Sequence, residues 1–209
     1  MQMLSYGLLA TALAMVTVQN LILFVTLAAV QAVLLGGQAL VMGWNTGDPA
    51  LFWAAGLTFA IKGAVIPLFL RYIIRRIKVM RVVDSTMTTK VQLLIAVVLV
   101  LLAHWATGSL SALGGASAET LPVALALVLI GVFLMVSRRV ALTQVIGLLV
   151  IENGLFLAAL ATADGLPVLV DAGIIFDVLV TAVVTGLFVW RINATFESID
   201  TVQLRRLRG

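Results

Sequence analysis

Three charged residues lie where a membrane-spanning chain would ordinarily have none. Lys62, Glu152 and Asp177 each stand near the middle of a long apolar stretch. A charge at the centre of a bilayer costs at least about 2.5 to 3.5 kcal/mol, so such a residue needs a partner and is by default a functional candidate. Low dielectric disfavours the charged form of both lysine and carboxylate. These groups could therefore exchange protons, and we predict that Lys62, Glu152 and Asp177 form a proton relay.

A stripe of hydroxyl groups extends this set along one predicted helix. Thr181 and Thr185 follow Asp177 by four and eight residues, and that spacing places all three on one helix face. Such a stripe could order water between the middle of the membrane and the basic side. Asp171 precedes Asp177 by six residues and points elsewhere around the helix, so we expect a separate group or an entry group.

Polar and small residues also surround Glu152. Gln144 and Asn153 supply hydrogen-bonding groups, while Gly147 and Gly154 would let a neighbouring helix approach closely. We therefore expect Glu152 to lie in a polar and tightly packed helix contact.

Pro67 is the corresponding feature near Lys62. A proline within a helix cannot donate its backbone hydrogen bond, so it frees the carbonyl of Gly63 and kinks the helix. We expect that kink to make room for water beside Lys62. The plainer alternative is a structural ion pair between Lys62 and one carboxylate, with no role in proton transfer.

The composition decides which elements position these residues. The chain has 209 residues, 63% hydrophobic and 11% charged, with a mean hydropathy of +1.21. A bilayer core of about 30 Å needs about 20 helical residues. We predict an all-α integral membrane protein, residues 1–209 forming one membrane domain, with seven transmembrane helices at 3–18, 21–43, 50–72, 91–107, 120–137, 140–162 and 168–190.

The positive charges give this topology a direction. Thirteen residues are Lys or Arg, and all except Lys62 fall beside the breaks after the third and fifth spans or after the seventh. The opposite loops contain only the acids Asp48, Glu119 and Asp164. The positive-inside rule then predicts an outside N-terminus and a cytoplasmic C-terminal tail at 193–209. A basic balance of this kind indicates anionic lipid rather than nucleic acid as a partner.

Redox chemistry within the chain is disfavoured by its composition. Cysteine is absent, and His104 is the single histidine. This excludes disulfides, cysteine-ligated iron–sulfur clusters and a bis-histidine haem held by this chain alone. We expect no metal, no catalytic residue and no cofactor in the chain, and we interpret His104 and Trp105 as anchors at the outer membrane interface.

Two stretches of the sequence resemble hydrogenase-4 component E, a membrane subunit of the formate hydrogenlyase type of group 4 hydrogenase. The first stretch contains the buried lysine and the proline that follows it: Phe59-Ala60-Ile61-Lys62, Pro67-Leu68 and Tyr72. The second covers the sixth and seventh spans: Ser137-Arg138-Arg139, Gln144, Gly147, Glu152-Asn153-Gly154, Gly173-Ile174 and Asp177.

The last three spans, residues 120–192, also resemble subunit K of NADH:quinone oxidoreductase. The likeness rests on Val145-Ile146-Gly147-Leu148, on Asn153 and on Ser198-Ile199-Asp200. Subunit K has a glutamate directly after the Ile-Gly-Leu run, where this chain has Leu149. Its carboxylate is Glu152, about one turn later, which favours the hydrogenase type. Residues 1–107 then form an N-terminal extension of four spans.

The resemblance implies a non-catalytic subunit of an oxidoreductase complex in the cytoplasmic (inner) membrane of a prokaryote. Its implied partners are antiporter-like membrane subunits, a membrane anchor similar to the H-type subunit of NADH:quinone oxidoreductase, and a peripheral hydrogenase-like arm on the cytoplasmic side. Nickel-iron and iron–sulfur centres would belong to those partners. Two alternatives stay open at this point: a subunit of a multi-subunit cation/proton antiporter, and a structural scaffold within such a complex.

Overall fold

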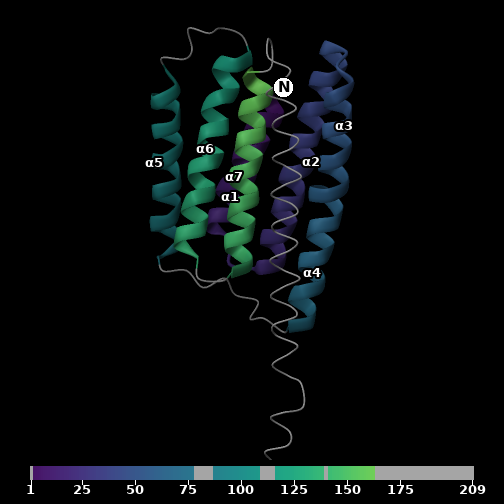
Figure 1. Cartoon of the computed structure of the whole chain (residues 1–209). Helices are drawn as coiled ribbons and strands as arrows, with labels where there is room; N and C mark the ends of the chain where they lie inside the picture. The colour runs from purple at the N-terminus through teal and green to yellow at the C-terminus, as the bar shows by residue number, and fades with distance from the viewer. Residues whose placement is uncertain (1, 78–86, 109–115, 139–140, 163–209) are drawn as a thin grey trace, which may run out of the picture.

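The computed structural model describes residues 2–77, 87–108, 116–138 and 141–162. Over these ranges the chain is helical, with no β-strand. The elements are α1 (Gln2–Thr17), α2 (Leu21–Thr46), α3 (Pro49–Leu57), the π-helix η1 (Thr58–Val65), α4 (Ile66–Ile77), α5 (Thr89–Thr107), α6 (Ala116–Ser137) and α7 (Ala141–Thr162). They run side by side along one axis, with α5, α6 and α7 to one side and α2, α3 and α4 to the other (Figure 1).

The helices fit the expectation of a membrane protein. Within the described ranges, five are long and apolar enough to cross a bilayer: Leu21–Thr46, Pro49–Arg75, Thr89–Thr107, Thr120–Ser137 and Leu142–Thr162. The helix α1 is apolar but shorter, with 16 residues. The first six predicted spans thus coincide with helices, whereas the seventh, at 168–190, lies outside the described residues. The full helix count and the orientation of the termini stay predictions.

Local sequence signals set the ends of α2 and the start of α3. The side chain of Asn20 accepts hydrogen bonds from the backbone N–H groups of Ile22 and Leu23, which caps α2 directly after α1. The predicted tight hairpin between the first two spans is therefore present. At the other end of α2, Gly47 has φ 71°, a left-handed conformation that glycine adopts without strain. Asp48 then caps α3 by accepting from the N–H of Ala50.

The contact between α6 and α7 depends on glycine. A Cβ atom on Gly131 would lie 2.8 Å from the carbonyl oxygen of Gly147, and one on Gly154 would lie 2.8 Å from that of Ala124. These distances leave no space for a side chain, so the two backbones pack directly against each other. The close approach expected at Gly147 and Gly154 is confirmed.

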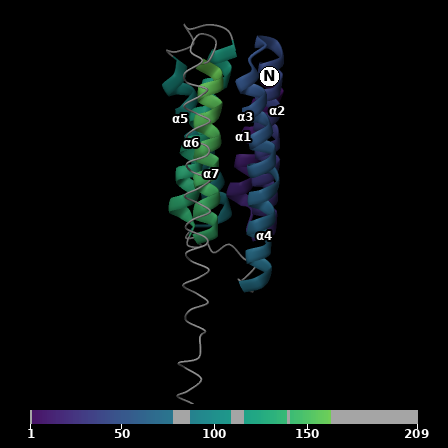
Figure 2. The ribbon, with the colours of Figure 1, turned by 45° about the vertical axis from the view of Figure 1, so that its right-hand side comes forward.

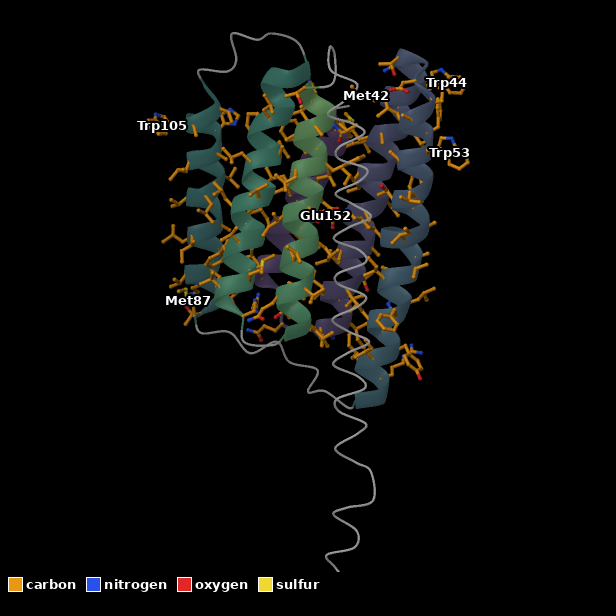
Figure 3. All side chains as sticks on the ribbon, viewed as in Figure 1. Met42, Trp44, Trp53, Met87, Trp105 and Glu152 are labelled. Atoms are coloured by element: carbon orange, nitrogen blue, oxygen red, sulfur yellow. The ribbon has the colours of Figure 1, made fainter. Side chains whose placement is uncertain are left out.

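Three of the four tryptophans lie within the described residues, and these three share one end of the bundle. Trp44, Trp53 and Trp105 lie at the same end, whereas Met87 lies at the opposite end (Figure 3). The three tryptophans are 82%, 79% and 83% exposed, as expected for a belt at a membrane interface. His104 is exposed beside Trp105. At the other end α4 projects beyond the neighbouring helices (Figure 2), and this projecting part carries basic residues.

Arg138 differs from the loop cation that the charge pattern predicted. Its side chain is only 2% exposed, and its Nη2 donates to the carbonyl oxygens of Met15, Val16 and Val18 at distances of 3.4, 2.7 and 3.3 Å. The guanidinium also lies 5.9 Å from the ring centre of Phe24. Burial lowers the pKa of Arg138 from its ordinary value. Arg138 therefore joins the end of α6 to the α1–α2 hairpin through buried hydrogen bonds, and it is not the solvent-exposed loop residue that the charge pattern suggested.

Candidate functional site

A π-helical segment positions Lys62. The segment η1 spans Thr58–Val65, and the N–H of Ile66 after it donates to the carbonyl of Ile61, five residues earlier. Such wide turns accommodate an extra residue and are frequent at functional sites. Pro67 follows in the first turn of α4. The backbone directly before Pro67 is thus irregular, in the form of a π segment that contains Lys62, and the bend expected at Pro67 stays a prediction.

The ammonium of Lys62 is paired with the carboxylate of Glu152. Nζ of Lys62 lies 3.3 Å from Oε2 of Glu152, and the two side chains are 3% and 1% exposed. Glu152 lies about midway along the bundle (Figure 3). The structure therefore brings together two of the three charges that the sequence placed at similar depth.

A chain of amide groups continues from this ion pair across the bundle. Nζ of Lys62 donates to Oδ1 of Asn153 at 3.1 Å, and Nδ2 of Asn153 donates to Oε1 of Gln31 at 3.1 Å. Nε2 of Gln31 then donates to the carbonyl oxygen of Leu8 at 3.2 Å. Gln31 and Asn153 are 0% and 2% exposed. The network joins η1, α7, α2 and α1, and we refer to Glu152, Lys62, Asn153 and Gln31 as the buried polar chain.

Opposite charges at this depth stabilise each other because little solvent screens them. At 3.3 Å two unit charges attract by about 5 kcal/mol with an effective dielectric constant near 20. Desolvation opposes that attraction, so the net stability gained from a buried pair is small. The arrangement can nevertheless move a proton, since a donor and an acceptor are in contact. Among the described residues, no group of three or more His, Cys, Asp or Glu side chains is placed to hold a metal ion.

A small cavity lies against the polar chain. Its volume is about 10 Å³, and Lys62, Pro67, Leu149 and Asn153 are among the residues that line it. A cavity of this size can hold about one water molecule. Leu149 occupies the position at which the resemblance to subunit K would place a glutamate, so a carboxylate there would face the same space as Lys62.

Among the described residues, Gln144 is a predicted site residue that is not part of this cluster. Gln144 is exposed, and its side chain donates to the carbonyl oxygen of Arg138 at 3.4 Å, about two turns from Glu152. The remaining predicted members lie outside the described residues: Asp171, Asp177, Thr181 and Thr185. Their part in a relay stays a prediction.

Sequence reasoning missed the buried amides of α2. Gln31 belongs to the polar chain, and Gln38, seven residues later, exchanges hydrogen bonds with Ser5 of α1, with its Nε2 3.1 Å from Oγ. Both glutamines are at most 1% exposed. Their seven-residue spacing within an apolar span was the available signal, because it places two amides on one helix face.

Similarity to known proteins extends over most of the chain. It is 30% identical over 204 residues to the uncharacterized protein Rv0085 of Mycobacterium tuberculosis. The aligned region covers 97% of this chain and 93% of Rv0085. The chain is 28% identical over 163 residues to hydrogenase-4 component E of Escherichia coli K12, covering 78% of this chain and 75% of that one. The same figures hold for hydrogenase-4 component E of Shigella flexneri. No family model matches the chain, and no solved structure does.

Proposed function

We propose that this chain, which belongs to the same family as the uncharacterized protein Rv0085 of Mycobacterium tuberculosis, is a non-redox membrane subunit of a hydrogenase-like complex. The complex would be of the group 4 nickel-iron hydrogenase or formate hydrogenlyase type. Within it, the chain contributes part of a lateral proton path that is coupled to redox chemistry in other subunits. The similarity to hydrogenase-4 component E supports membership of such a complex.

The contact between Lys62 and Glu152 is the observation that carries this proposal. When Glu152 takes up a proton, the ammonium of Lys62 loses an attraction of about 5 kcal/mol, which favours release of a proton from Lys62. Conversely, loss of the proton from Glu152 restores the charged pair. Proton occupancy at one group therefore biases the other, and that bias is what a relay between neighbouring subunits requires.

Asp177 is the proposed next member of the path. It has the same predicted depth as Lys62 and Glu152, and the Thr181 and Thr185 hydroxyls would continue the path toward the cytoplasmic side. Antiporter-like subunits and an H-type membrane anchor are the proposed membrane partners. A peripheral arm in the cytoplasm would hold the nickel-iron and iron–sulfur centres, in an assembly of the prokaryotic inner membrane.

Replacing Glu152 by Gln tests the proposal. The amide keeps the shape and hydrogen bonding of the side chain but cannot carry the relayed proton. We expect the assembled complex to keep electron transfer to an artificial acceptor and to lose most of the redox-driven membrane potential. Asp48→Asn is the matched control, because Asp48 caps α3 at the end of the bundle. Unchanged coupling in Glu152→Gln, with assembly checked by native electrophoresis, would favour the scaffold alternative.

A second variant asks whether the position of the carboxylate matters. Leu149 and Lys62 line the same cavity. Leu149→Glu in the Glu152→Gln background therefore places a new carboxylate beside that cavity and close to Lys62. We expect partial recovery of the membrane potential. If the pair has only a structural role, Glu152→Gln leaves coupling unchanged in the assembled complex, and Leu149→Glu has no loss to recover.

Copurification in mild detergent distinguishes the hydrogenase-like complex from the antiporter alternative. A partner with the cysteine motifs of a nickel-iron hydrogenase large subunit would support our proposal. Recovery of antiporter chains with no redox protein would favour a subunit of a multi-subunit cation/proton antiporter.

A further inference from the structure

The groups at the two ends of the buried polar chain fix the direction in which the amides of Gln31 and Asn153 point. At one end, the carbonyl oxygen of Leu8 can only accept a hydrogen bond, so Gln31 must turn its NH₂ group toward it. The oxygen of Gln31 then faces Asn153, whose own NH₂ group donates to it. As a result the oxygen of Asn153 faces the ammonium of Lys62, which can only donate.

This order of donors and acceptors suits Lys62 in both of its protonation states. The ammonium has three N–H donors, and a neutral amine keeps two, so either form can donate to Oδ1 of Asn153. Nζ can therefore stay in place, next to both Asn153 and Glu152, while a proton leaves or arrives. A relay whose heavy atoms do not need to move avoids the cost of reorganising a buried site.

We infer that Gln31 is a positioning residue for the proposed proton path: it holds the Asn153 amide with its oxygen toward Lys62. This inference rests on the proposed function, and it assigns a part of the mechanism to α2 and α1. Those helices belong to the N-terminal four-span extension predicted at residues 1–107, so the extension does more than support the last spans.

Gln38 provides the comparison that separates this role from simple packing. It lies on the same helix and is equally buried, but its side chain bonds to Ser5 rather than to a member of the buried polar chain. Loss of either amide removes hydrogen bonds between α1 and α2. Only loss of the Gln31 amide frees Asn153 to turn its NH₂ group toward Nζ.

The charged groups around Lys62 decide how a pH effect of a change at Gln31 is interpreted. In the part of the chain that the structure describes, Glu152 on α7 is an acid in contact with Lys62. The helices α2 and α3 contain no charged or titratable side chain, and the first cation of α4 is Arg71, nine residues from Lys62. A change at Gln31 therefore acts on Lys62 and Glu152 and not on another titrating group of these helices.

The experiment compares Gln31→Met with Gln38→Met in the assembled complex. For Gln31→Met we expect about tenfold less membrane potential generation per electron transferred to an artificial acceptor. We also expect the alkaline limit of coupled activity to move about one pH unit lower, because the ammonium form loses its oriented acceptor. Gln38→Met should leave both the coupling and the pH limit as in the unchanged protein.

Equal behaviour of the two variants would overturn the inference. If Gln31→Met does not assemble, Gln31→Glu decides, since a protonated carboxyl can donate to Leu8 and accept from Asn153 as the amide does. We expect coupling in Gln31→Glu to be kept at acidic pH, where the protonated carboxyl reproduces both hydrogen bonds of the amide, and loss of coupling there in an assembled complex would contradict us. If Glu152→Gln abolishes coupling while Gln31→Met does not, only this inference fails; if Glu152→Gln has no effect, the proposed function fails.

Discussion

Replacing Lys62 by Met removes the cation from a buried pair and leaves its carboxylate in the bundle. Nζ and Oε2 lie 3.3 Å apart, with side chains at most 3% exposed. Removing one partner of a buried ion pair costs about 3 to 5 kcal/mol. Protonation of Glu152 limits that cost: neutralising an ordinary glutamate at pH 7 requires about 4 kcal/mol, and about 1.4 kcal/mol less for each pH unit below 7.

We therefore expect Lys62→Met to lose about 3 to 4 kcal/mol of stability at pH 7, with a smaller loss at lower pH. For a chain of this size that corresponds to a melting midpoint lower by about 10 °C, while the complex still assembles at growth temperature. The double variant Lys62→Met/Glu152→Gln leaves no carboxylate at this site and should recover most of the loss. The difference between the two variants isolates the charge interaction from the change in packing.

The assay measures the thermal midpoint of the detergent-solubilised complex at pH 6 and pH 8. Fluorescence-detected gel filtration monitors how much intact complex remains at each temperature. A complete cycle uses the unchanged protein, the two single variants and the double variant. A midpoint of Lys62→Met within about 2 °C of the unchanged protein at pH 8 would refute a charged pair at this site. A further drop in the midpoint on adding Glu152→Gln would refute it equally.

Two further predictions concern topology and packing. In this cysteine-free chain, a cysteine at Ala116 should react from outside the cell with an impermeant thiol reagent while one at Thr86 should not, and reversed labelling would contradict the assigned orientation. Arg138→Met should destabilise the complex by about 1 to 3 kcal/mol, because the buried carbonyls at the end of α1 lose their donor, whereas Met at the exposed Arg75 should leave the melting midpoint unchanged. Since arginine stays charged at any working pH even with its pKa lowered by burial, the effect of Arg138→Met should be the same at pH 6 and pH 8.

Apolar run lengths and charge placement predict much of this fold. They located the helices of the first six predicted spans, and they placed Lys62 and Glu152 at one depth, because insertion energy depends on position along the membrane normal. They could not give the contacts around each helix. The uncharged amide of Gln31 has no large insertion penalty to reveal it, and the π segment around Lys62 depends on how neighbouring helices re-pair the backbone.

Arg138 shows the limit of counting charges along a sequence. It stands at a loop on the basic side, as the topology requires, yet the packing of α6 against the α1–α2 hairpin buries its guanidinium. One-dimensional patterns report which side of a membrane a residue occupies. They do not report whether carbonyl oxygens from a distant helix end lie close enough to replace water around it.

The most direct test of the central claim is whether Glu152 changes its protonation during redox turnover. Infrared difference spectra of the intact complex, recorded before and after the redox reaction is started, monitor the carbonyl stretch of protonated carboxyl groups. We predict a difference band in that region that shifts in heavy water, is unchanged in Asp48→Asn and loses a component in Glu152→Gln. A spectrum of Glu152→Gln with the same carboxyl difference band as the unchanged complex would contradict the assignment of Glu152 as a proton carrier.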